Sequence, residues 1–138
     1  RPIITKILRW FATGFFLVAG AMHFVIPEFY LAMMPPFIPF QSFFVIITGI
    51  AEMAGAVALQ VPKLRRTSGI LMIVMLVAIF PANIYVAWAQ PVLPNVSYTP
   101  ASMWWRLLLQ PVFIAWIWRV SLLKDHILDN IRQPIPNA

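Results

Sequence analysis

The chain contains four apolar stretches with very few charged side chains, each about as long as a membrane-spanning helix. These stretches limit what the sequence can fold into. A helix of roughly 20 apolar residues crosses the hydrocarbon core of a bilayer. Because the linkers are short, neighbouring helices are expected to pack antiparallel. The sequence therefore predicts one all-α domain, an integral membrane four-helix bundle over residues 1–138. Its predicted spans are approximately Thr5–Ile26, Gln41–Val61, Ser68–Ala89 and Met103–Leu123.

The composition excludes several classes of protein. Hydrophobic residues make up 62% of the 138 residues and charged residues 10%, whereas about 25% of the residues of a soluble domain are charged. A soluble protein of this size has too little interior to bury so much apolar surface. Most soluble enzyme folds and nucleic-acid-binding modules are thereby excluded. The chain has no cysteine, which excludes disulfides, thiolate metal sites and iron–sulfur clusters.

The distribution of lysine and arginine predicts the orientation in the membrane. The connections Pro27–Phe40 and Gln90–Ser102 contain neither residue. By the positive-inside rule these connections are external and both termini are cytoplasmic. The expected location is the inner (cytoplasmic) membrane. The net charge of +6 then needs no nucleic-acid partner, because nine of the ten basic residues lie at the cytoplasmic side: Arg1, Lys6, Arg9, Lys63, Arg65, Arg66, Arg119, Lys124 and Arg132.

Two segments outside the spans have recognisable patterns. The segment Met33–Pro39 is apolar but contains three prolines, so it cannot form a regular helix. We expect it to fold as a lid over the outer mouth of the bundle. The tail Val120–Ile131 has apolar residues at fourfold spacing. That pattern predicts a helix that leaves the membrane or lies on its inner surface.

Each predicted span carries a polar residue that is costly to place in lipid. His23 lies in the first span, Glu52 in the second, Asn83 in the third, and Arg106 and Gln110 in the fourth. A charged residue at the bilayer centre costs about 2.5–3.5 kcal/mol on insertion scales, so it normally faces protein and has a use. Small residues near these positions mark faces where helices approach closely. We expect the five to converge in the outer half of the bundle as a ligand-binding or proton-handling site.

A structural interpretation of the same residues stays open. Glu52 and Arg106 can form a buried ion pair that fixes the helix register, while Asn83 and Gln110 tie helices together and His23 meets the headgroup layer. No metal or haem is expected, since the two histidines lie on opposite predicted sides and too few other ligands are near. No nucleophile motif is recognisable, so no catalytic residue is assigned and enzyme activity stays open.

Several short motifs follow one another along the chain: His23-Phe24, Pro27, Tyr30, Pro35-Pro36-x-x-Pro39, Gly49-x-x-Glu52, Arg65-Arg66, Phe80-Pro81-Ala82-Asn83 and Trp105-Arg106-Leu107 with Gln110. Together they resemble the DoxX-like family of small integral membrane proteins. The resemblance covers approximately residues 5–122 and implies a four-helix fold, found mostly in bacteria. It also implies an association with quinol oxidase, thiosulfate:quinone oxidoreductase or membrane redox-defence systems, although most members have no established activity.

We therefore expect an outer-half pocket that binds a lipophilic small molecule, above all a quinone, within or beside a membrane oxidoreductase. Arg106 and Gln110 would bond a carbonyl or anionic group, Glu52 would exchange a proton, and His23 would line the entrance. Three aromatic residues are expected to line the pocket: Phe37, Phe80 and Trp105. The alternative is a non-catalytic assembly or structural subunit of a membrane complex or homo-oligomer.

Overall fold

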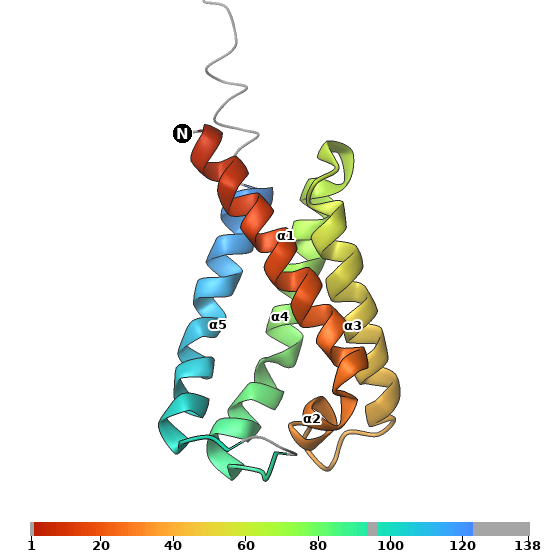
Figure 1. Cartoon of the computed structure of the whole chain (residues 1–138), viewed down its shortest axis with the longest axis vertical. Helices are drawn as coiled ribbons and strands as arrows, with labels where there is room; N and C mark the ends of the chain where they lie inside the picture. Colours follow the sequence, from red (N-terminus) through yellow and green to blue (C-terminus); the bar gives the residue numbers. More distant parts are fainter. Residues whose placement is uncertain (1, 94–96, 123–138) are drawn as a thin grey trace, which may run out of the picture.

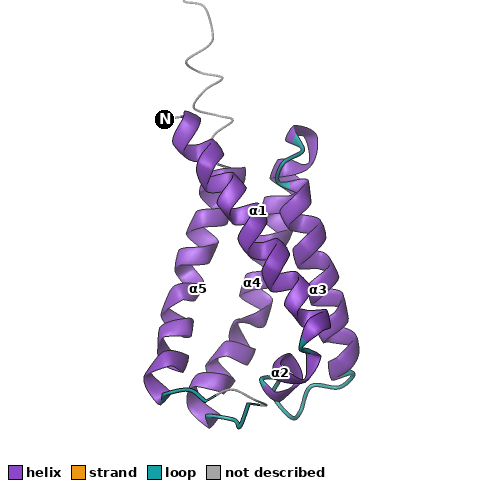
Figure 2. Ribbon diagram, in the orientation of Figure 1, coloured by secondary structure: helices purple, strands orange, loops and turns teal. Residues whose placement is uncertain are grey.

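The computed structural model describes residues 2–93 and 97–122, and its regular structure there is entirely helical (Figures 1 and 2). The all-α prediction is confirmed. The predicted tail helix beyond Leu122, with His126, lies outside the described residues. The helices are α1 (Pro2–Val25), α2 (Pro27–Ala32), α3 (Gln41–Ala58), α4 (Pro62–Ala89) and α5 (Pro100–Ser121).

The helix boundaries follow from proline and from two left-handed residues. Pro27, Pro62 and Pro100 begin α2, α4 and α5, where the missing N–H would have had no intrahelical partner. Phe40 precedes α3 with φ 54° and Gln90 follows α4 with φ 51°, so the chain reverses at both points. As a result α4 begins six residues before the predicted third span, and residues 27–32 of the first connection form a short helix. Residues 33–39 are not helical, as the prolines predict.

Successive long helices run in opposite directions, so the molecule is an up-and-down bundle (Figure 1). Residues Ile3–Val25 of α1, together with α3 and α4, are long and apolar enough to cross a membrane, which indicates a multi-pass membrane protein. Large apolar side chains such as Phe11, Phe44 and Leu71 lie exposed on them, as lipid-facing residues would. α5, with 22 residues, does not meet the same criterion among the described residues. Its four tryptophans, two arginines and Gln110 make it less apolar.

α1 and α3 approach each other closely through two glycines. A Cβ atom added at Gly20 would lie 2.9 Å from the carbonyl oxygen of Gly49, and one added at Gly49 would lie 2.8 Å from Cβ of His23. Small residues permit such close helix contacts in membrane proteins. Since Glu52 is three residues after Gly49 and on the same face, this contact brings α1 and its His23 next to Glu52.

The buried core divides into two clusters at opposite ends of the bundle. The larger one joins all four long helices and contains Phe16, Leu59, Met72 and Ile117. The smaller one lies at the end that carries α2 and is built around Met33, Val86, Leu93 and Met103. The cavity described below adjoins the larger cluster, whose Phe16 and Leu76 form part of its lining.

The end of the bundle with the larger cluster is also tied by hydrogen bonds between α1 and α5. Arg9 Nε donates to the carbonyl oxygen of Val120 at 3.0 Å, and Trp116 Nε1 donates to that of Leu8 at 3.1 Å. Thr13 on the same helix donates to the carbonyl oxygen of Ala56 on α3 at 3.0 Å. α1 is therefore fixed to both neighbours at this end.

Gly49→Ala is expected to lower the free energy of unfolding by about 1–3 kcal/mol, because the added methyl group must push α1 and α3 apart. Gly14→Ala is the matched control. A Cβ atom at Gly14 meets no atom within 4 Å, so this variant should be neutral or more stable by up to about 1 kcal/mol. Reversible unfolding in detergent micelles measures both. Equal effects of the two substitutions would contradict the close contact.

Candidate functional site

A cavity of about 340 Å³ lies between the four long helices and is bordered by α2. Ligand pockets range from about 300 to 1,000 Å³, so this one suits a small molecule or headgroup. All five polar residues singled out in the sequence line it, although four different elements of the fold supply them: His23, Glu52, Asn83, Arg106 and Gln110. Tyr30 and Thr48 add two further polar side chains to the wall.

His23 and Glu52 form the polar corner of the cavity between α1 and α3. His23 Nδ1 lies 3.9 Å from a carboxyl oxygen of Glu52 and 2.9 Å from the carbonyl oxygen of Ala19. Since a carbonyl oxygen only accepts, Nδ1 carries a proton that it donates to Ala19. Nε2 of a neutral His23 is then the acceptor. Both side chains are little exposed, at 12% and 13%, so neither is solvated as a surface residue would be.

Tyr30 covers this corner from α2. Its ring stacks on that of His23, with centroids 3.9 Å apart and planes at 17°, and its hydroxyl lies 3.4 Å from the carbonyl oxygen of Ala19. Burial raises the pKa of the Tyr30 hydroxyl, as does the nearby Glu52, while Arg106 opposes them. The hydroxyl is therefore a neutral hydrogen-bond donor at physiological pH. Tyr30 is not among the predicted site residues, although its position in the His-Phe…Pro…Tyr motif was a signal.

Arg106 faces the cavity with a weak partner. Its Nη1 donates to the sulfur of Met33 at 2.8 Å, and a thioether is a poor acceptor. Glu52 and Arg106 are the two side chains of opposite charge that line the cavity. Glu52 lies beside His23, and among the described residues no ion pair within 4.0 Å joins Glu52 to Arg106. A guanidinium group removed from water without an anionic partner is unfavourable. The cavity beside it is the place where a ligand oxygen would offset that cost.

Asn83 and Gln110 form the wall between α4 and α5. Asn83 Nδ2 donates to Gln110 Oε1 at 2.8 Å, and Gln110 Nε2 donates to the carbonyl oxygen of Leu76 at 2.6 Å. Gln110 is only 3% exposed. Both ends of its amide already have protein partners, so the interaction that the structure shows for this pair is a tie between two helices.

The aromatic lining differs from the expected one. The expected residues Phe37, Phe80 and Trp105 do not line this cavity, and Phe37 and Trp105 are 82% and 64% exposed. Phe15, Phe16 and Phe113 line it instead. For Trp105 the reason is helical phase, and Phe37 lies in the non-helical segment 33–39. Trp105 is about 100° away from Arg106 around the helix, whereas residues three, four and seven positions after Arg106 share its face: Leu109, Gln110 and Phe113.

The cavity wall is therefore polar at one end and apolar at the other. Its donors and ionisable groups gather where α2 covers the bundle, and its opposite end is lined by Phe15, Phe16 and Phe113. Within residues 2–93 and 97–122, no group of three or more His, Asp or Glu side chains is arranged to hold a metal ion. The arrangement can hold a molecule with hydrogen-bonding oxygens at one end and apolar carbon at the other.

Gln110→Leu is expected to lower the free energy of unfolding by about 1–2 kcal/mol, since it removes two buried hydrogen bonds and leaves the Asn83 amide without its Gln110 partner. Arg106→Gln should cost less, because it removes a bond to sulfur and a buried charge. Unfolding in micelles measures both variants. A larger loss of stability in Arg106→Gln would identify Arg106 as a structural residue.

Of the comparisons with known proteins, the one with family models gives a match. No curated protein and no solved structure matches the chain. The family model that matches residues 12–121 is described as a domain of unknown function, DUF8561, and that description does not name the DoxX-like family. The matched range contains all the polar residues that line the cavity. The chain is a member of the DUF8561 family.

Proposed function

We propose that the cavity binds the headgroup of a lipophilic small molecule, specifically a quinone, in a membrane redox system. The observation that carries the proposal is Arg106, whose side chain faces the cavity with a thioether as its hydrogen-bond partner. Intramembrane ionisable residues generally mark functional sites. Here Arg106 shares one cavity with Glu52, His23 and Tyr30.

The chemistry of a quinone fits these groups. A quinone has two carbonyl oxygens on opposite sides of a flat ring, and each accepts hydrogen bonds. Arg106 would donate to one oxygen, and the Tyr30 hydroxyl or a protonated Glu52 carboxyl group would donate to the other. Reduction to the quinol adds two electrons and two protons, and Glu52 would supply or receive one of the protons. Electrons would come from a partner oxidoreductase, as the DoxX-like resemblance implies.

The proposal includes four spans in the inner membrane with cytoplasmic termini. α5 packs beside α4 and, at 22 residues, is about 33 Å long, enough to cross the hydrocarbon core. The chain has no cysteine, so single-cysteine variants can test this topology. Ser97→Cys is expected to react with a membrane-impermeant maleimide in intact cells. Lys63→Cys should react only after the cells are opened. Labelling of both from outside would overturn the topology.

A second candidate function is that of a non-catalytic assembly subunit. The hydrogen bonds from Asn83 through Gln110 to Leu76 favour it, because they connect two helices and leave the Gln110 amide with no unpaired end. In that case the polar residues would hold the four helices in register, and the cavity would contain only lipid or water.

Mass spectrometry of the mildly solubilised protein is expected to find a stoichiometric quinone that Arg106→Gln loses. Removal of a charge-assisted hydrogen bond should weaken binding by about 10- to 100-fold. Arg119→Gln is the matched control, because it makes the same substitution at the exposed end of the same helix. Bulk phospholipid alone in all samples would favour the assembly subunit.

Glu52→Gln separates proton exchange from binding. The amide retains hydrogen-bonding capacity but cannot donate a proton to the ring, so quinone binding should lose its pH dependence while some affinity remains. If Glu52→Gln binds the quinone with the affinity of the unsubstituted protein at every pH, Glu52 does not exchange a proton with the bound quinone.

A further inference from the structure

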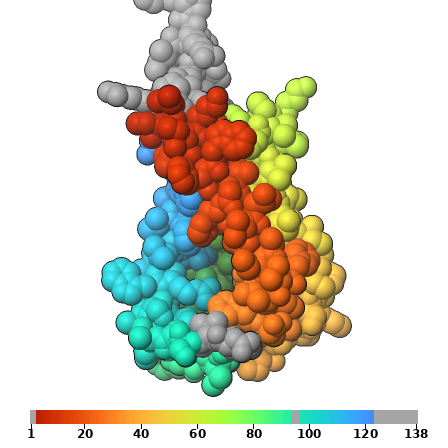
Figure 3. All heavy atoms as spheres, viewed as in Figure 1, coloured from red at the N-terminus to blue at the C-terminus, as the bar shows by residue number. Residues whose placement is uncertain are grey.

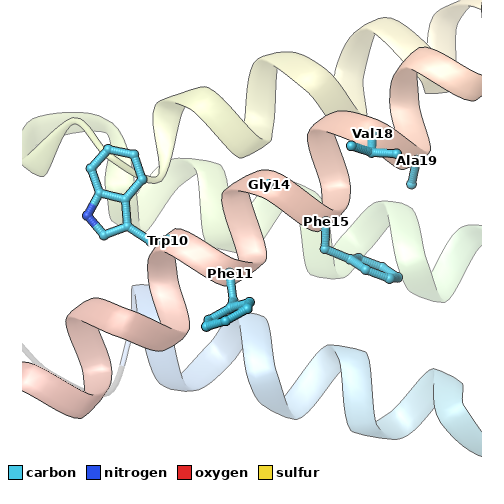
Figure 4. A pocket seen from close by; sticks show the side chains of 6 residues that line it. All are labelled: Trp10, Phe11, Gly14, Phe15, Val18 and Ala19. Atoms are coloured by element: carbon cyan, nitrogen blue, oxygen red, sulfur yellow. The ribbon is translucent and has the colours of Figure 1, made fainter.

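An apolar groove of about 650 Å³ runs along the surface of α1. Its lining consists of Trp10, Phe11, Gly14, Phe15, Val18 and Ala19, as Figure 4 shows. Phe11, Phe15 and Ala19 project from one side of the helix and Trp10 from the other (Figure 4). A Cβ atom at Gly14 would meet nothing within 4 Å, so the bare backbone there forms an open floor.

The groove and the cavity share part of their walls. Phe15 and Ala19 line both. Phe15 is nevertheless 46% exposed, and Leu109, which lines the cavity from α5, is 42% exposed. The cavity wall therefore reaches the molecular surface between α1 and α5. The space-filling view shows a recess at this place, with atoms of α4 visible behind it (Figure 3).

The direction of the groove is set by α1. From Ala19, at the cavity, to Trp10 the helix rises roughly 14 Å. The route leads away from the polar corner at His23 toward the end where Arg9 and Trp116 hold α1 against α5. The polar end of a ligand in the cavity would therefore lie near Arg106, and an apolar extension of it would follow α1 through the hydrocarbon layer.

We propose that the cavity ligand carries a long apolar chain, which leaves between α1 and α5 and lies in the groove over Gly14. This inference rests on the proposed function, since it concerns the same ligand. The shared wall at Phe15 and Ala19 identifies the occupant as the chain of the cavity ligand. The ligand class is then a membrane-resident amphiphile, such as a quinone with an isoprenoid chain. The ligand would enter sideways from the bilayer.

The test uses a 1,4-benzoquinone with an alkyl chain that bears a photoreactive diazirine, added to the protein in lipid nanodiscs. After irradiation, peptide mapping should find adducts between Trp10 and Ala19. Gly14→Leu should lower this labelling about tenfold, because its isobutyl group occupies the space of the chain. Gly14→Ala is the matched control, with labelling near that of the unsubstituted protein. A thermal scan verifies that both variants fold.

The same experiment separates failure of the inference from failure of the proposed function. The chainless ring is added as a competitor, and it should displace the probe equally from the unsubstituted protein and from Gly14→Ala. Arg106→Gln should lose the labelling, because the headgroup is no longer held. Labelling no stronger than that by a diazirine fatty acid, with no competition by the ring, would overturn both proposals.

Three other outcomes would overturn the inference alone. In the first, the ring competes but the adducts lie elsewhere, such as the groove between α3 and α4 near Ala54 and Leu71. In the second, a diazirine phospholipid labels the residues around Gly14 as strongly as the quinone does, so that the groove is a general lipid contact. In the third, the probe links two copies of the chain through α1, so that a second copy occupies the groove.

Discussion

The close approach of α1 and α3 at Gly20 and Gly49 is the constraint on which the site depends. Two helices that meet through bare backbone leave no room for lipid between them, and their neighbouring side chains must face each other. His23 is placed against Glu52 for this reason. α2 follows within two residues of α1, so its Tyr30 is carried onto the same corner. A single backbone contact thus determines three of the polar positions in the cavity.

The second constraint is the need to satisfy polar groups in an apolar environment. Asn83 and Gln110 meet it within the protein. Arg106 meets it only in part, because sulfur accepts hydrogen bonds poorly. Under the proposed function, an oxygen of the ligand in the cavity offsets the remaining cost. Arg106 and Gln110 lie four residues apart on one face of α5. Of these two side chains, only the Gln110 amide has strong protein partners at both ends.

Much of the architecture can be predicted from the sequence, because long apolar stretches and helix-starting prolines act locally. The convergence of five polar residues could also be anticipated, since small residues mark the faces where membrane helices meet. The roles of Tyr30 and Met33 could not, because both depend on how α2 turns back onto the bundle, and Met33 also meets Arg106, 73 residues away. The expected aromatic residues do not line this cavity, and for Trp105 the cause is helical phase, because it adjoins Arg106 in sequence but faces outward.

The uneven distribution of packing has a mechanical consequence. At one end the four helices are held by a shared core and by the hydrogen bonds of Arg9 and Trp116. At the other end the helices are held in two pairs, α1 with α3 through Gly20 and Gly49 and α4 with α5 through Asn83 and Gln110. The smaller core cluster around Met33 joins the α2 segment to the second pair, and Arg106 donates a hydrogen bond to the sulfur of Met33. Widening of the cavity at this end would therefore have to break contacts of Met33, while the hydrogen bonds of Arg9 and Trp116 at the first end stay intact.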